Sequence, residues 1–297
     1  MQQQRQHIPR RALFLLAVLT LIWGTTWPLF PLAVREVSVW TFRAASVAIA
    51  GAVLLLVARL RGQSLVIERR HWRTVVAASL CYLAVWNVAS TYSAILIPSG
   101  QSAMLGFTMP LWLALIAWAV LGQRLGGRML LAIALGAAAV LLLMVRSVDD
   151  YARAPLGFAL GLLAGLGWAI GTLVLKRRPV DVAATVLTGW QLLVAAVPIT
   201  LGALILGDGR WFVPSWTSIL VIGYIVLMPM SIGNVAWFSI VGLLPANVAA
   251  LSSILVPVLA MVSGAIVRDE PLGLLQWAAM ACCAAALSLA LMRPSRA

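Results

Sequence analysis

A large part of this sequence is repeated once, at a fixed offset of 147 residues (from 87 to 234, for example). From about residue 87 to residue 291, many residues of the first half recur at this offset without a gap. The run Asn-Val-Ala at 87–89 recurs at 234–236, and Pro110 recurs as Pro257. Two copies of one sequence pattern are expected to form two copies of one supersecondary unit. The repeat therefore predicts two similar halves, residues 1–148 and 149–297.

The composition is that of a membrane protein, because 63% of the residues are hydrophobic and only 10% are charged. The apolar stretches are long enough, at about 1.5 Å per residue, to cross roughly 30 Å of hydrocarbon. The stretches that we expect to span the bilayer are residues 12–32, 40–60, 73–95, 99–121, 128–145, 155–176, 182–206, 216–241, 245–267 and 272–292. The sequence thus predicts an all-α integral membrane protein with ten transmembrane helices, five in each half.

The net charge of +13 is distributed unevenly between the two sides of such a membrane protein. With ten spans, 15 Lys and Arg residues fall on the side of the chain ends and six on the other side. Basic residues favour the cytoplasmic side, so both termini are expected in the cytoplasm, with the protein in a bacterial inner membrane. The basic clusters then act as topology signals in a lipid bilayer, and a role in binding nucleic acid is disfavoured.

The odd number of spans in each half determines how the halves are related. The second half starts on the side of the membrane opposite to the first, so the two copies are inverted relative to one another. Inverted repeats give a route to alternating access, because the two copies can exchange conformations and open the opposite side. This arrangement favours a transporter of a small molecule. Since both copies lie in one chain, we expect a monomer to suffice.

The residues that carry a family resemblance lie in both halves. Each fourth span contains a proline, Pro110 or Pro257, and the run Arg-Asp-Glu-Pro-Leu-Gly occupies 268–273, whereas the first half has Gln123 at the position of Glu270. With the five-span repeat, these features resemble the EamA-type branch of the drug/metabolite transporter superfamily. The run Leu-Ile-Trp-Gly-Thr-Thr-Trp at 21–27 is most similar to YddG-type exporters. The resemblance implies export of amino acids, including aromatic or large neutral ones, and of flat, viologen-like organic cations.

Acidic residues are expected only in connections or at span ends. A proton-driven multidrug exporter needs a carboxylate near the bilayer centre, so the sequence favours facilitated, gradient-driven export over proton coupling. Arg43 is the one basic residue that enters a span, and we expect it to extend to the outer interface or to act at a gate. The candidate gating or hinge residues are Pro110, Pro257, Arg43 and Glu270.

Without charges in the spans, a cavity must bind its substrate through aromatic rings, amides and hydroxyls. Trp168 is expected to face inward, because it follows Gly161 by seven residues on the face of a glycine stripe at 157, 161 and 165. The candidate substrate-binding residues are Tyr82, Trp86, Asn87, Gln101, Trp168, Trp190, Asn234 and Trp237. Packing between helices explains each tryptophan equally well, and interhelical hydrogen bonding explains the paired asparagines better than binding does.

Other activities lack the residues that they require. Metal-ligand spacing and a phosphate-binding glycine loop are both missing from the sequence, so we expect no metal, no cofactor and no ATP hydrolysis. A membrane enzyme has only Asp149-Asp150 or Asp269-Glu270 as an acid pair, and both resemble ordinary loop charges. The alternative within the same superfamily is a nucleotide-sugar or other metabolite carrier, which needs cationic residues for a phosphate.

Overall fold

The computed structural model describes residues 10–122, 126–145, 154–207, 214–237, 246–270 and 272–291. Every regular element in these ranges is helical. Seven helices are long and apolar enough to cross a membrane, with shorter apolar helices over Leu130–Ala139, Val256–Arg268 and Leu274–Ala286. The long ones cover Phe14–Ala33, Val39–Leu60, Arg69–Leu96, Ser99–Val120, Pro155–Arg177, Ala184–Leu206 and Trp216–Trp237. The all-helical membrane fold that the composition predicts is therefore confirmed.

Several of these helices are interrupted by tighter or wider turns. The elements of the first half are α1 (Arg10–Thr26), η1 (Trp27–Leu29), α2 (Phe30–Ala33), α3 (Val39–Leu60), η2 (Arg69–His71), α4 (Trp72–Ala78), η3 (Ser79–Ala84), α5 (Val85–Leu96), α6 (Ser99–Gly106), α7 (Met109–Leu121) and α8 (Gly127–Val145). Those of the second half are α10 (Pro155–Arg177), α11 (Ala184–Leu206), α12 (Trp216–Ile225), η4 (Val226–Gly233), α14 (Ala246–Arg268) and α15 (Leu274–Leu291).

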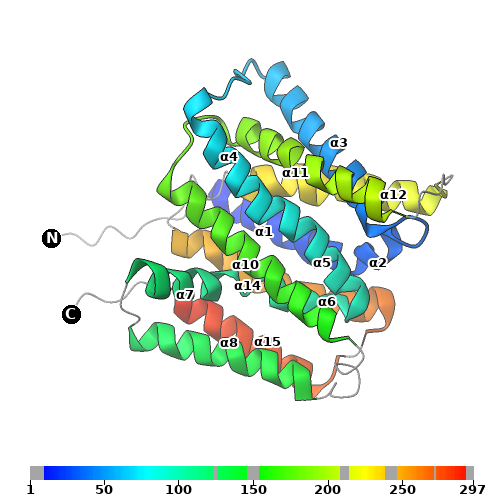
Figure 1. The fold of residues 1–297 in the computed structure, drawn as a ribbon. Helices are drawn as coiled ribbons and strands as arrows, with labels where there is room; N and C mark the ends of the chain where they lie inside the picture. The colour runs from blue at the N-terminus through cyan, green and yellow to red at the C-terminus, as the bar shows by residue number, and fades with distance from the viewer. Residues whose placement is uncertain are drawn as a thin grey trace.

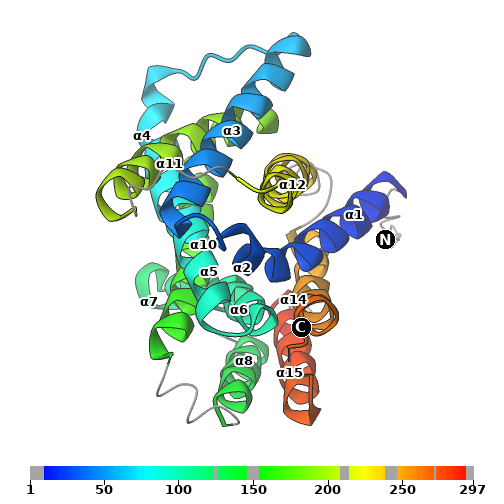
Figure 2. The same cartoon turned by 90° about the vertical axis from the view of Figure 1, so that its right-hand side faces the viewer.

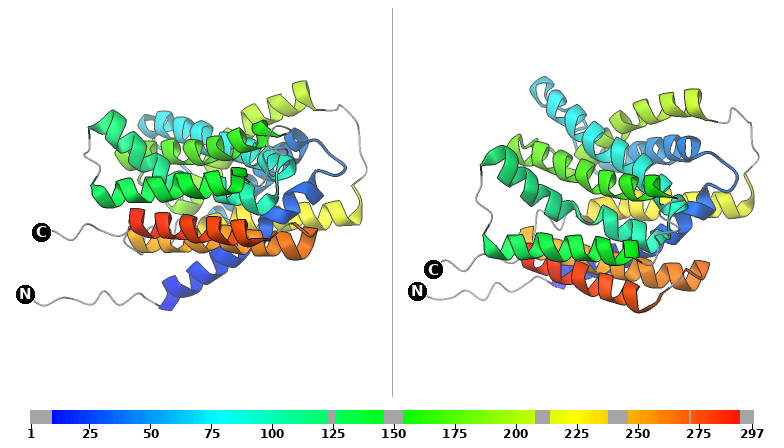
Figure 3. Two further views of the ribbon diagram at one scale, coloured as in Figure 1. Left: turned by 90° about the horizontal axis from the view of Figure 1, so that it is seen from below. Right: turned by 60° about the horizontal axis from the view of Figure 1, so that its bottom comes forward.

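The helices run roughly side by side between two ends of the molecule (Figure 1). The start of α1 and the end of α15 lie at the same end (Figure 3), whereas α2 and the start of α6 lie at the opposite end, which Figure 2 views directly. Helices of the two halves pair with one another: α3 packs along α11, α8 along α15, α5 along α10 and α1 along α14. The core therefore lies between the halves, so neither half folds around a core of its own.

Two stretches of π-helix occupy matching positions in the two halves. The first, η3, covers Ser79–Ala84, and the second, η4, covers Val226–Gly233. Their first residues, 79 and 226, are separated by the repeat offset of 147. A π-helix places one extra residue in a turn and is frequently found at functional sites. In η4 the hydroxyl of Ser231 donates to the carbonyl oxygen of Val226 at 2.8 Å, five residues earlier. The repeat therefore reproduces a local backbone irregularity as well as a sequence pattern.

The two prolines predicted as hinges have different local structures. The fourth span is interrupted at residues 107 and 108, between α6 and α7, just before Pro110. Proline lacks an N–H and disfavours helical backbone in the residue before it, which explains why the helix breaks here. Pro257 instead lies inside the continuous helix α14. Proline thus lies in the first turn of a new helix in one half and inside a continuous helix in the other.

The glycine stripe of α10 allows the close packing that its spacing predicts. A methyl group at Gly157 would meet Ile97, one at Gly161 would meet Leu105, and one at Gly165 would meet the carbonyl oxygen of Gly106. Because these positions lack side chains, α10 approaches α5 and α6 closely. Trp168, seven residues after Gly161, lies on the same face of α10 as the stripe and is likewise buried in the interior.

Gly167 gives a direct test of this packing. A methyl group at Gly167 would collide with the backbone carbonyl oxygen of Cys81 in η3, which cannot rotate away. We expect Gly167→Ala to destabilise the purified protein by about 1–3 kcal/mol, the usual cost of overpacking. Gly223→Ala is the matched control, because Gly223 is also helical and has no atom within 4 Å of the added methyl group. Thermal melting in detergent should therefore separate the two variants, and equal melting temperatures would contradict the packing.

Candidate functional site

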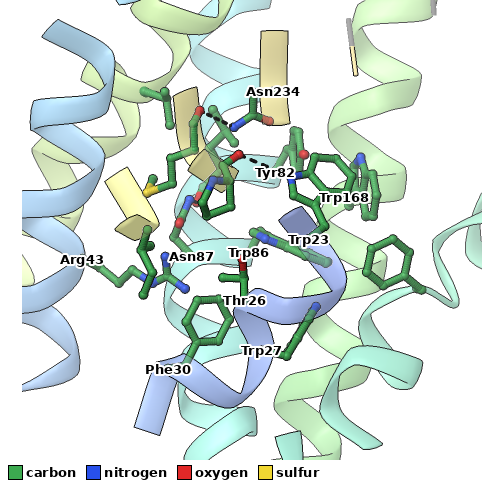
Figure 4. Close-up of a pocket in the computed structure, with 16 residues that line it drawn as sticks. Trp23, Thr26, Trp27, Phe30, Arg43, Tyr82, Trp86, Asn87, Trp168 and Asn234 are labelled. Carbon is green, nitrogen blue, oxygen red and sulfur yellow. Dashed lines mark hydrogen bonds between the residues drawn. The ribbon is translucent and has the colours of Figure 1, made fainter. Parts of the chain in front are cut away.

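A pocket lies at the centre of the molecule, between the two halves (Figure 4). Its cavity of about 70 Å³ is smaller than an aromatic amino acid, so a bulky ligand requires the surrounding rings to move apart. The residues that line it come from both halves and are Trp23, Thr26, Trp27, Phe30, Arg43, Tyr82, Leu83, Trp86, Asn87, Phe107, Trp168, Leu192, Ile225, Pro229, Met230 and Asn234. Five of the eight candidate binding residues are among them. Seven of these 16 described residues are aromatic, two are amides and one, Arg43, carries a formal charge.

Trp168 is the centre of the aromatic wall. Its side chain is 2% exposed, and its ring stacks on Tyr82 with centroids 5.6 Å apart and planes 7° apart. Trp86 and Phe107 meet it edge-on at 5.0 and 5.5 Å. Edge-on and offset-stacked rings attract one another beyond the area that they bury, so this group forms a preorganised wall. The prediction that Tyr82, Trp86 and Trp168 lie together agrees with this geometry.

Three further aromatic residues were not among the sequence candidates. Trp23, Trp27 and Phe30 follow one another along α1, η1 and α2, and all three line the pocket. The ring of Trp27 lies 5.5 Å from Phe30 and 6.0 Å from Trp86. Their spacing of four and three residues places them on one face of a helix, which is the signal that could have identified them. The ring nitrogen of Trp23 donates to the carbonyl oxygen of Pro229 at 3.3 Å and so joins the two halves.

The paired asparagines have the same local geometry in both halves. The side-chain nitrogen of Asn87 donates to the carbonyl oxygen of Leu83 at 2.8 Å, and that of Asn234 donates to Met230, also at 2.8 Å. Both acceptors lie four residues earlier, inside the π-helical stretches η3 and η4. The hydrogen bonds that the structure describes for these amides are therefore within one helix rather than between helices. Both side chains line the pocket, where each has polar atoms left for a ligand.

Arg43 lies in a different place from the one that the sequence predicts. Its side chain is 2% exposed and lines the pocket, so extension to the outer interface is wrong. The guanidinium carbon lies 4.4 Å from the ring centroid of Phe30 and 4.7 Å from that of Phe42. Its Nε donates to the hydroxyl of Thr91 at 2.6 Å, and that hydroxyl donates onward to the carbonyl oxygen of Asn87 at 2.7 Å. Packing of α2 and α5 against α3 thus encloses a cation that we expected at the bilayer surface.

The remaining candidate binding residues do not line the pocket. Trp237 contacts the rings of Trp23 and Trp168, each at 5.9 Å, and so supports the aromatic wall from behind. Gln101 is buried in α6. Trp190 lies in another cluster, where its ring nitrogen donates to the carbonyl oxygen of Leu65 at 2.8 Å. The structure therefore brings Trp237 to the edge of the site and leaves Gln101 and Trp190 outside its lining.

Two carboxylates join the halves at the end opposite to the start of α1. Glu270, which follows α14, accepts hydrogen bonds from the backbone nitrogen and hydroxyl of Ser99 at 3.0 and 2.8 Å, and from the backbone nitrogen of Gly100 at 3.3 Å. Its side chain is 12% exposed and also pairs with Arg268 at 3.3 Å. We name this the Glu270 contact. A carboxylate is favourable at the positive N-terminal end of α6.

The second carboxylate makes an equivalent connection in the other direction. Glu36, between α2 and α3, accepts hydrogen bonds from the backbone nitrogen of Ser215 at 3.0 Å and from the hydroxyl of Ser218 at 2.8 Å, at the start of α12. We name this the Glu36 contact. The Glu270 contact thus links the second half to the start of a helix in the first half. The Glu36 contact links the first half to the start of a helix in the second half. Both contacts therefore join the two halves through a carboxylate at the start of a helix.

The Glu36 contact gives a pH-dependent prediction. Hydrogen bonds from Ser215 and Ser218 lower the pKa of Glu36 below its ordinary value. The stability that the contact contributes is therefore present above the unfolded pKa and is lost as the pH falls through the folded pKa. We expect Glu36→Gln to melt at a lower temperature than the wild type at pH 7, with a difference that disappears under acidic conditions. A difference independent of pH would assign the effect to packing instead of charge.

An aromatic pocket enclosed between membrane-crossing helices of two halves defines a membrane transporter. Comparison with known proteins agrees: residues 10–145 and 155–292 match the EamA-like transporter family, and the chain belongs to that family. The uncharacterized transporter YvbV of Bacillus subtilis strain 168 is 25% identical over 267 residues, 89% of this chain and 86% of that protein. The protein named "Probable amino-acid metabolite efflux pump" of Escherichia coli K12 is 28% identical over 191 residues, 61% of this chain and 63% of that protein.

A solved crystal structure supports the fold. It aligns with this chain with a TM-score of 0.66 at 19% identity, and the alignment covers 93% of this chain and 96% of that one. The chain is thus a multi-pass membrane transporter, as the sequence resemblance implies.

Proposed function

We propose that this protein exports amino acids, including aromatic or large neutral ones, across a bacterial inner membrane. The observation that carries the proposal is the central pocket, whose aromatic wall and two amides suit a compact molecule with an apolar side chain and a polar end. The relative named as an amino-acid metabolite efflux pump supports the same class of substrate. As a transporter, the protein would release its substrate chemically unchanged.

The mechanism that we propose is alternating access by two inverted five-helix repeats in one monomer. Three features support the repeats: the family matches two successive stretches, the π-helical stretches begin at the repeat offset, and Asn87 and Asn234 make the same hydrogen bond. The pairing of α3 with α11 and of α8 with α15 also joins equivalent predicted spans of the two halves. Two such copies can exchange conformations around a fixed pocket.

The Glu36 and Glu270 contacts form the gate in this proposal. Both lie at the end opposite to the start of α1 and the end of α15. If the termini are cytoplasmic, as the distribution of basic residues predicts, these contacts close the periplasmic side. The described conformation is then one that is closed to the outside, and export requires both contacts to open. Pro110, at the break between α6 and α7, and Pro257 within α14 are the proposed hinges on either side of the Glu270 contact.

The pocket also bears on energy coupling. Among the residues that the structure describes, those lining the pocket include no Asp or Glu, so they offer no carboxylate that exchanges a proton for substrate. We therefore propose facilitated export down the substrate gradient. Counterflow in proteoliposomes tests this: the purified protein should exchange radiolabelled phenylalanine or leucine, and the exchange should persist when an ionophore collapses the proton gradient. Absence of exchange for every amino acid would refute the substrate class, and loss of exchange with the ionophore would refute uncoupled transport.

A further inference from the structure

Among the described residues that line the pocket, the guanidinium of Arg43 is the one formal charge, and part of it has no hydrogen-bond partner. Nε is occupied by Thr91, but Nη2 is buried and makes no hydrogen bond to any residue that the structure describes. An ionised donor left unpaired in a buried site is costly, so such a group usually has a partner that the bare protein lacks. Figure 4 shows the guanidinium between Phe30 and Asn87, directed toward the pocket.

Resting on the proposed function, we infer that Arg43 binds the carboxylate of the transported substrate. The substrate class is then an aromatic or bulky apolar carboxylate, whose ring lies against the Trp168 wall. A carboxylate matches the fork of a guanidinium, which presents parallel N–H donors in one plane. Amino acids can bind the guanidinium in this way through their carboxylate, and so can the corresponding acids that lack the amino group.

The surroundings of Arg43 hold the guanidinium in one orientation. The hydroxyl of Thr91 donates its proton to the carbonyl oxygen of Asn87, so its lone pairs point toward Nε of Arg43. The rings of Phe30 and Phe42 lie within 5 Å of the guanidinium carbon and add cation–π attraction. These contacts occupy one edge and the faces of the group. Nη2 has no hydrogen-bond partner among the described residues, and because it is buried, a ligand reaches it when the surrounding rings move apart.

The charge balance of the pocket distinguishes between classes of substrate. The lining residues include one arginine and no acidic residue, so an empty pocket carries an uncompensated positive charge. A monocarboxylate neutralises this charge, whereas a viologen-like dication adds two more of the same sign. The ammonium of an amino acid has ring faces, amide oxygens and the hydroxyls of Thr26 and Tyr82 available to it, but no carboxylate among the described lining residues. The pocket therefore selects for the carboxylate and tolerates the amine, and the flat organic cations implied by the family resemblance fit it poorly.

A ligand series on the wild-type protein tests the inference without relying on any variant. Binding to the protein in nanodiscs would be measured by calorimetry for 3-phenylpropanoate, its amide, phenylalanine and phenethylamine. The acid and phenylalanine are expected to bind at least tenfold more tightly than the amide and the amine, as loss of a charge-assisted hydrogen bond in a buried site predicts. Binding of phenethylamine or of the amide as tightly as the acid would overturn the inference, and so would failure of the acid to bind.

Variants of Arg43 then assign the effect to this residue. Arg43→Gln is expected to lose at least tenfold in affinity for 3-phenylpropanoate, while Arg43→Lys, which keeps the charge but not the fork, retains part of the affinity. If the Arg43→Gln protein is folded and binds the acid as tightly as the wild type, Arg43 is a packing residue and does not bind the substrate. Counterflow distinguishes failure of the Arg43 assignment from failure of the proposed function. Exchange of amino acids that does not depend on the Arg43 side chain contradicts only the anchor, whereas absence of any exchange contradicts both.

Discussion

Replacing Trp168 with alanine is expected to abolish amino-acid counterflow and to destabilise the protein markedly. The indole is 2% exposed, stacks on Tyr82 and contacts Trp86 and Phe107, so its removal leaves a cavity at the centre of the core. Truncation of a buried tryptophan typically costs about 3–5 kcal/mol. The ring contacts therefore predict that stability and transport fall together in this variant.

Two variants separate these effects. Trp168→Phe keeps a ring in the wall, so it should fold with a smaller loss of stability and still transport slowly. Trp190→Ala removes a tryptophan outside the pocket, one held by a hydrogen bond to Leu65. It should lower the melting temperature while leaving the affinity for substrate unchanged. A folded Trp168→Phe protein with wild-type transport kinetics, or a change of affinity in Trp190→Ala, would contradict the placement of the site.

Replacing Glu270 with alanine is expected to open the closed end of the molecule. The carboxylate accepts hydrogen bonds from Ser99 and Gly100 and pairs with Arg268, and its removal leaves the first backbone donors of α6 without an acceptor. Hydrogen bonds to charged groups contribute about 1.5–3 kcal/mol, so the closed state should become less populated by roughly tenfold or more. Hydrogen–deuterium exchange at the start of α6 would report the opening.

Glu68 provides the control for this variant. It also pairs with an arginine, Arg70, but both side chains are mostly exposed, with relative exposures of 63% and 72%. Exposed ion pairs contribute about 0–1 kcal/mol, so Glu68→Ala should leave exchange and transport nearly unchanged. Glu270→Gln keeps an acceptor without the charge and should fall between the two. Unchanged exchange at α6 in Glu270→Ala would show that the Glu270 contact does not hold the gate.

The parts of the site that the sequence predicts are those set by the repeat and by helical spacing. The offset of 147 residues pairs Asn87 with Asn234, and the glycine stripe places Trp168 on the inward face of α10. Both features follow from the spacing of residues in the sequence, so they can be predicted without knowledge of the tertiary structure.

The parts that the sequence does not predict depend on interrupted helices and on packing between segments. Phe107 reaches the pocket because the fourth span breaks at residues 107–108, and Trp27 does so through the short 3₁₀ stretch η1. Arg43 is the fourth residue of the predicted span 40–60, near a span end, where extension of the side chain to the interface is the ordinary expectation. Its burial follows from α2 folding back over it with Phe30, a tertiary contact that no single segment encodes.

We propose that one pocket between two inverted halves is reached alternately from the two sides of the membrane. Met230 lines this pocket and is 6% exposed, so a cysteine at this position reports access to it. In a background without Cys81, Cys282 and Cys283 that still transports, Met230→Cys would be treated with an impermeant thiol reagent from each side of oriented vesicles. The account predicts labelling from the cytoplasmic side at rest, a shift to periplasmic labelling when Glu270→Ala is added, and protection by phenylalanine on both sides. Labelling from one side only, whatever the state of Glu270, would contradict alternating access.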